Sequence, residues 1–227
     1  MYDARLVFTK PEDGYATVGF SQQIIGRLDG MNEKGLVVGL HFVNNEERAE
    51  GFFATTIVRM LLEECANVQE AVQLITAIPH GYCYNFSITD RSGKSIIVEA
   101  SPNEQIIIDQ TPLICTNHFE SESLMDKNRS PLQLKGSIAR KKYLESLLKS
   151  SESVPNYYEA FNHGKSPLFS YQYDQFFGTL HTVVYVPEEL KVIVGIGRDC
   201  PPQEFSLQEY MSQNLSLPKV MLGWIGD

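Results

Sequence analysis

Residues 29–43 read DGMNEKGLVVGLHFV and carry the clearest structural pattern in the sequence. Residues 35–43 form a nearly continuous apolar run rich in valine and leucine, which is typical of a strand covered on both faces. We therefore expect this strand to lie in the middle of a sheet. The residues before it are mostly polar and contain glycine, so they are expected to form the turn that leads into the strand.

Two strands are expected on the N-terminal side, at residues 4–9 and 16–22. The residues between them include Pro11, Asp13 and Gly14, which favour the fixed and positive φ angles of a turn. The pattern predicts a hairpin.

On the C-terminal side, apolar residues recur at helical spacing in two consecutive segments. The first runs from Phe53 to Leu61, and the second begins after Asn67, a favourable N-cap residue with Glu70 three positions later. Strands are then expected at 84–89, 94–99, 105–109 and 113–116, helices from Ser137 and over 157–161, and strands at 180–186 and 191–196. The tail beyond Cys200 has too little periodicity to assign.

This order of strands, helices, strands, helices and strands is expected when two sheets are packed between helical layers. With 43% hydrophobic residues in 227 positions, the chain can bury a sizeable core. We interpret residues 1–227 as a single domain.

Charge and hydropathy exclude several classes of protein. The net charge of −9 disfavours a nucleic-acid partner, since phosphate binding requires clustered lysine and arginine. The apolar runs fall well short of the ~20 residues that span a bilayer, so a soluble, cytoplasmic protein is expected.

The cysteines, at positions 65, 83, 115 and 200, lack the spacing of a zinc site or a small disulfide scaffold. Cys83 and Cys115 lie in apolar segments, where a free cysteine is usually a small buried hydrophobic residue.

Several blocks of sequence resemble one enzyme family. They are DGMNEKGL at 29–36, NFSITD at 85–90, residues 93–99, TNHF at 116–119, Ser137 with Arg140, and residues 182–185. In this order they resemble the choloylglycine hydrolase and penicillin V acylase family, with its related acyltransferases acting on 6-aminopenicillanic acid. The resemblance implies the four-layer αββα sandwich of N-terminal-nucleophile hydrolases, an α+β fold, here expected to be truncated at the N-terminal strand.

The resemblance also implies a nucleophile. The family uses an N-terminal cysteine whose own α-amino group accepts the proton, followed by an Arg-Asn-x-Asp block. Asp3 is interpreted as the remnant of that block and hence as the activating carboxylate, although Tyr2-Asp3 can also be unrelated to it. No cysteine precedes Cys65, so we expect this chain to be inactive without further sequence.

Three residues correspond to the part of the family's site that stabilises negative charge. Asn117 matches the oxyanion-hole asparagine, although an asparagine there can also end a strand and cap a turn. His41 stands where relatives have asparagine or tyrosine as a second donor. Arg140 matches an arginine in the later part of the family pattern that stabilises the catalytic residues electrostatically, although it can also be an ordinary surface residue of a basic helix face.

The function implied is hydrolysis or transfer of a linear amide bond in an acylated small-molecule substrate, without a metal or organic cofactor. The alternative is a non-catalytic relative that binds an acylated ligand. An open sheet edge would favour a homo-oligomer.

The aromatic residues between Phe169 and Phe177 can line an acyl pocket or simply anchor their own loop. The histidines lack metal-ligand spacing, and no G-x-S-x-G motif is present.

Overall fold

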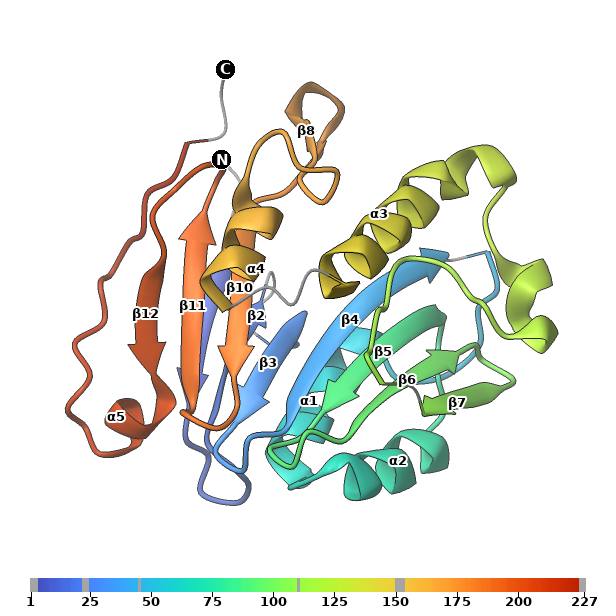
Figure 1. Ribbon diagram of the computed structural model, residues 1–227. Helices are drawn as coiled ribbons and strands as arrows, with labels where there is room; N and C mark the ends of the chain where they lie inside the picture. Colours follow the sequence, from blue (N-terminus) through green and yellow to red (C-terminus); the bar gives the residue numbers. More distant parts are fainter. Residues whose placement is uncertain (1–3, 22–24, 45, 110, 150–153, 225–227) are drawn as a thin grey trace.

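The computed structural model describes residues 4–21, 25–44, 46–109, 111–149 and 154–224 (Figure 1). Its largest element is an antiparallel sheet of seven strands in sequential order. The strands are β1 (Arg5–Thr9), β2 (Thr17–Ser21), β3 (Asp29–Asn32), β4 (Val37–Asn44), β5 (Cys83–Thr89), β6 (Ser95–Ala100) and β7 (Gln105–Asp109). The predicted central strand is confirmed, since β4 is the fourth of the seven.

A second antiparallel sheet contains three strands, and a small ribbon contains two. The sheet comprises β10 (His181–Val186), β11 (Lys191–Ile196) and β12 (Gln203–Ser206), and the ribbon comprises β8 (Tyr171–Gln172) and β9 (Phe177–Gly178). The helices are α1 (Ala54–Glu64), α2 (Val68–Ala77), α3 (Pro131–Lys149), α4 (Val154–Asn162) and α5 (Leu207–Met211), with short 3₁₀ turns η1 (Glu122–Lys127) and η2 (Tyr173–Gln175).

Two hydrophobic clusters show how these elements are layered. On one face of the large sheet, Val38 and Phe86 pack with Ile57 of α1 and Ile75 of α2. On the other face, residues of β2 and β3 pack against Val192 and its neighbours in the second sheet. Helix α4 contacts β10 of the second sheet. Helix α3, like α4, lies on the side of the large sheet opposite α1 and α2 (Figure 1). The predicted four-layer αββα sandwich is therefore confirmed.

Successive side chains of the central strand β4 point to opposite faces of the large sheet. Leu36, Val38 and Leu40 belong to the cluster under α1 and α2, whereas Val37 belongs to the cluster between the sheets. Gly39 and His41 consequently face away from α1 and α2. This face carries the polar residues of the candidate site.

Asn32 explains why the DGMNEKGL stretch is structurally important. Its side chain is fully buried. Its Nδ2 donates to the carbonyls of Leu62 and Cys65 at 2.9 and 2.7 Å, and its Oδ1 accepts from the amides of Lys34 and Leu36, both at 3.0 Å. Asn32 thus fastens the β3–β4 turn to the end of α1.

Local predictions were correct where the pattern was strong. The hairpin β1–β2 is formed, and Asn67 caps α2 by accepting from the Glu70 amide at 3.0 Å. Residues 29–32, expected as a turn, form β3, because their backbone pairs with both β2 and β4. Helix α3 begins at Pro131, before the expected Ser137, and the unassigned tail contains β12 and α5.

The expected strand at residues 113–116 is wrong. These residues have no strand pairing, because the chain here turns to run across the face of the sheet. Side chains rather than a backbone ladder hold it there, as the site shows. Within the described residues, none of the helices is both long and apolar enough to cross a membrane.

Candidate active site

Two rows of cross-strand neighbours form the floor of the candidate site. Asp29 of β3, Gly39 of β4 and Ser87 of β5 are paired in register, and the next row contains His41, Asn85 and Glu99 of β4, β5 and β6. Residues directly opposite one another in an antiparallel sheet project from the same face. The sheet register therefore brings together polar side chains that are far apart in the sequence.

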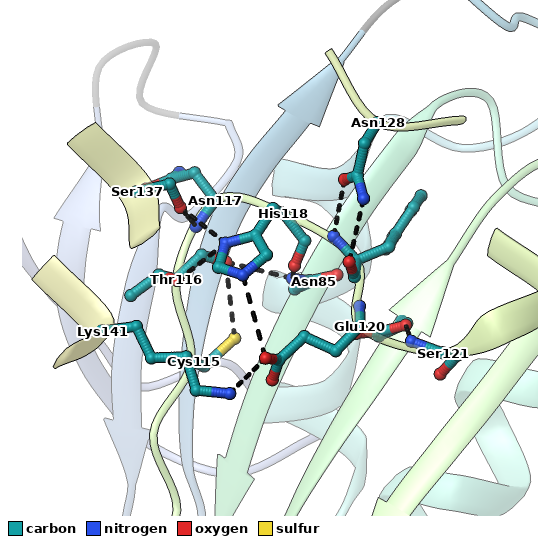
Figure 2. A network of polar contacts seen from close by, with 12 residues as sticks. Asn85, Cys115, Thr116, Asn117, His118, Glu120, Ser121, Asn128, Ser137 and Lys141 are labelled. Carbon is teal, nitrogen blue, oxygen red and sulfur yellow. Dashed lines mark hydrogen bonds and ion pairs between the residues drawn. The ribbon is translucent and has the colours of Figure 1, made fainter. Parts of the chain in front are cut away.

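Residues 116–121 cross this floor, held by side chains of the sheet. Asn85 Nδ2 donates to the carbonyls of Thr116 and His118 at 3.0 and 2.7 Å, as Figure 2 shows. The Glu99 carboxylate accepts from the amides of Glu120 and Ser121 at 2.7 and 3.0 Å. The crossing segment is fixed without being a strand.

Asn117 lies in this segment and is constrained from two directions. Its Nδ2 donates to the carbonyl of Phe42 in β4 at 3.0 Å. From α3, Arg140 Nη2 donates to Asn117 Oδ1 at 2.9 Å, and Ser137 Oγ accepts from the Asn117 amide at 2.8 Å. Across the described residues, Phe42 is the single hydrogen-bond acceptor for Nδ2, so the second N–H of that nitrogen can donate to a ligand.

His41 has one hydrogen bond to a neighbouring strand. Its Nε2 lies 3.0 Å from Ser87 Oγ. Burial lowers the pKa of His41 to about 4, the positive charge of Arg140 contributes to the decrease, and the negative charge of Asp29 opposes it. The imidazole is therefore neutral near pH 7, with one nitrogen as donor and the other as acceptor.

The structure thus brings together three of the four predicted site residues. Asn117 and Arg140 are in direct contact, and His41 is close enough to sense the charge of Arg140. Arg140 is half-buried and turned towards Asn117 rather than being an unattached surface residue. Asp3 lies outside the described residues, so its role stays a prediction.

A neighbouring network was not anticipated from the sequence (Figure 2). Ser137 Oγ lies 2.8 Å from His118 Nδ1, His118 Nε2 lies 3.8 Å from Glu120 Oε1, and Lys141 pairs with Glu120. The order serine, histidine, carboxylate is that of a catalytic triad. However, Ser137 is only 4% exposed and its oxygen accepts from Asn117, so it holds Asn117 in place instead of attacking a substrate. The sequence contained one signal for this role: Ser137 stands three residues before Arg140, so the two side chains lie on the same face of α3.

A second unanticipated contact links the other sheet to the floor. Tyr185 of β10 donates to Asp29 Oδ1 at 2.5 Å, and the Phe20 amide donates to the same oxygen at 3.1 Å. Burial raises the pKa of Tyr185 well above its ordinary value, and the negative charge of Asp29 adds to the increase. The tyrosine remains protonated and fixes the carboxylate between the sheets.

The cysteines are free, and three of them are poor nucleophiles. Burial raises the pKa of Cys65 to about 12 and that of Cys83 to about 11. Burial also raises the pKa of Cys115, which is half-buried beside the crossing segment. Attack by sulfur requires the thiolate, so these environments oppose it.

Two other features bear on the sequence predictions. In the loop with Phe169, that residue is buried, whereas Tyr171, Phe176 and Phe177 are exposed. Among the described residues, no group of three or more histidine, cysteine, aspartate or glutamate side chains is arranged to hold a metal ion.

Comparisons with known proteins identify the family and the fold of this chain. The sequence model of the acyl-coenzyme A:6-aminopenicillanic acid acyl-transferase family matches residues 1–199. A comparison with curated protein sequences finds no match. Among solved structures, the chain is similar to a mutant of conjugated bile acid hydrolase from Clostridium perfringens, with a TM-score of 0.64 at 15% identity over 86% of this chain and 78% of that one.

Penicillin V acylase from Agrobacterium tumefaciens is similar too, with a TM-score of 0.60 at 18% identity over 91% of this chain and 82% of that one. At such low identities these structures establish the fold, and the family match over residues 1–199 establishes the relationship. The chain belongs to the acyl-coenzyme A:6-aminopenicillanic acid acyl-transferase family.

Proposed function

We propose that this site stabilises the oxyanion formed when a linear amide bond is hydrolysed or its acyl group is transferred. The observation that carries the proposal is the constrained side chain of Asn117. One Nδ2 hydrogen is used by Phe42, Oδ1 is held by Arg140, and the other Nδ2 hydrogen is available. A donor fixed before the reaction needs no reorganisation as negative charge develops.

Arg140 assists this role through Asn117. A cation bonded to the amide oxygen polarises the amide, which strengthens donation from its nitrogen. His41 supplies the second donor of the site in this proposal. No step requires a metal or an organic cofactor, since acyl transfer needs an attacking group, a proton acceptor and oxyanion donors.

The substrate class is an acylated small molecule with a linear amide bond. The family match supports it, and the similar solved structures are a conjugated bile acid hydrolase and a penicillin V acylase. The alternative function is binding of an acylated ligand without turnover. It is favoured by the environments of Cys65, Cys83 and Cys115, since burial raises the pKa of each thiol and opposes attack by sulfur.

The experiment compares two polypeptides. One contains residues 1–227, and the other carries an added N-terminal segment that begins with a cysteine. Each is assayed with penicillin V, conjugated bile salts and N-acyl amino acids. We expect turnover from the longer polypeptide and negligible turnover from residues 1–227.

In the longer polypeptide, Asn117→Ala should lower kcat on the order of 100-fold to 1000-fold, with a smaller effect on KM. Asn214→Ala is the matched control, because the side chain of this exposed asparagine bonds only to nearby Ser212 among the described residues. An Asn117→Ala variant within twofold of its parent would contradict the proposal. Calorimetric binding of an N-acyl amide without turnover by the longer polypeptide would favour the non-catalytic alternative.

A further inference from the structure

The imidazole of His41 is held by an arrangement that also includes Ser87 and Gly39. Gly39 and Ser87 are directly opposite each other on β4 and β5, and His41 follows Gly39 on the same face of β4. A Cβ atom at Gly39 would lie 2.7 Å from Ser87 Oγ and 3.6 Å from His41 Nε2. The missing side chain is what allows the serine hydroxyl and the imidazole to meet.

The hydroxyl of Ser87 has one proton and two acceptors within reach. Its oxygen lies 3.0 Å from His41 Nε2 and 3.5 Å from the Gly39 carbonyl. A separation of 3.5 Å is long for a hydroxyl donor, whose usual distance to oxygen is about 2.7–2.8 Å. The imidazole nitrogen is therefore the better acceptor for this proton.

The protonation of the two ring nitrogens is coupled. In a neutral imidazole one nitrogen carries the proton, and the hydrogen bond made by the other nitrogen selects which. The pKa of His41 is lowered to about 4, chiefly by burial, so the neutral ring is the relevant form near pH 7. In the described structure Nδ1 makes no hydrogen bond, which leaves it available to a ligand.

We propose that Ser87, given room by Gly39, donates to Nε2 of His41 and thereby fixes the imidazole as the Nδ1–H tautomer, which presents an N–H donor to the substrate oxygen. Ser87 is then a positioning residue and acts through His41. This inference rests on the proposed function for its catalytic meaning. The tautomer itself can be measured without turnover.

The test is long-range ¹H–¹⁵N correlation spectroscopy of the histidine side chains in ¹⁵N-labelled residues 1–227. His41→Gln identifies the His41 signals by their loss. We expect Nδ1 to show the shift of a protonated nitrogen and Nε2 that of an unprotonated one. Ser87→Ala should shift the population towards the Nε2–H form, and Ser87→Thr, which keeps the hydroxyl, should restore the parental pattern.

Two more variants separate this effect from general damage. Gly39→Ala should reproduce the Ser87→Ala pattern, because its methyl group would push Ser87 away from His41. Ser95→Ala is the matched control, since it removes a hydroxyl that bonds to Thr89 at 2.6 Å on the neighbouring strand pair and should leave the His41 signals unchanged.

The outcomes are distinct. A parental protein with Nε2 protonated would overturn the proposal even if no variant folds, and an unchanged tautomer in Ser87→Ala would remove the role of Ser87. In a polypeptide that hydrolyses an amide substrate, Ser87→Ala should lower kcat on the order of tenfold with little change in KM. This loss is smaller than the one expected when an oxyanion donor is removed completely. If the tautomer behaves as expected but no amide is cleaved, the proposed function fails and the positioning of His41 stands.

Discussion

Replacing Asn32 by alanine should remove a buried connection between the β3–β4 turn and α1. The side chain makes two hydrogen bonds to carbonyls at the end of α1 and accepts two from amides in the turn, at 2.7–3.0 Å. Alanine preserves the Cβ atom and deletes all four bonds. The carbonyls of Leu62 and Cys65 and the amide of Leu36 belong to buried residues, whereas Lys34 is exposed.

The expected loss follows from these partners. A net hydrogen bond contributes about 1 kcal/mol, and a buried partner left unsatisfied costs about 1–3 kcal/mol. Water can replace the bond to the exposed Lys34 amide, so three buried partners determine the effect. We expect the free energy of unfolding to fall by about 3–5 kcal/mol, a large part of the roughly 5–15 kcal/mol typical of a domain.

Urea unfolding followed by circular dichroism measures this loss through the midpoint and slope. Asn103→Ala is the control, because the exposed Asn103 side chain donates one hydrogen bond, to Glu47 at 2.7 Å, and should cost less than about 1 kcal/mol. Asn32→Asp keeps the acceptor but places a buried carboxylate oxygen against the carbonyl oxygens of Leu62 and Cys65, so at pH 7 it should destabilise the protein at least as much as alanine does. A loss below about 1 kcal/mol for Asn32→Ala, at unchanged slope, would refute the proposed connection.

Two further predictions concern titratable groups. Cys115 should resist iodoacetamide in the folded protein, because burial raises the pKa of its thiol; rapid stoichiometric labelling would show that it is accessible and ionised. Burial alone would raise the pKa of Asp90, but hydrogen bonds from Ser92 and the Val68 amide outweigh it and lower the pKa below its ordinary value of 3.8. A lowered folded-state pKa stabilises the protein above the unfolded-state value, and this stability is lost as the pH falls through the folded-state value. Asp90→Asn should therefore reduce stability at pH 7, and its difference from the parent should shrink below about pH 4; a difference independent of pH would contradict the assignment.

The parts of the fold that could be predicted are those with local signals. The alternating strands, the β1–β2 turn and the cap at Asn67 depend on neighbours within a few residues. The crossing segment at 116–121 could not be predicted, because the hydrogen bonds that hold it come from Asn85 and Glu99, which lie on strands β5 and β6. An apolar run such as 113–116 appears as a strand when those distant partners are unknown.

The candidate site was predictable to a different extent. Asn117, His41 and Arg140 were found by resemblance, and their contacts could not be inferred from spacing. Ser87 lies within the NFSITD block and Gly39 lies two residues before His41, but the sequence indicated no role for either, because their relation to His41 exists only in the register of β4 and β5. A one-residue shift of β5 relative to β4 would place Ser87 and Gly39 on opposite faces of the sheet.

The anchoring of Asn117 explains how an imidazole can stand at position 41 without disturbing the other donor. Asn117 bonds to the backbone carbonyl of Phe42, 75 positions away in the sequence, and not to the His41 side chain. Its remaining contacts, with Ser137 and Arg140, come from α3. A side-chain replacement at position 41 therefore leaves every contact of Asn117 in place. The two donors can change independently, one held by the backbone of β4 and by α3, the other by a hydroxyl on β5.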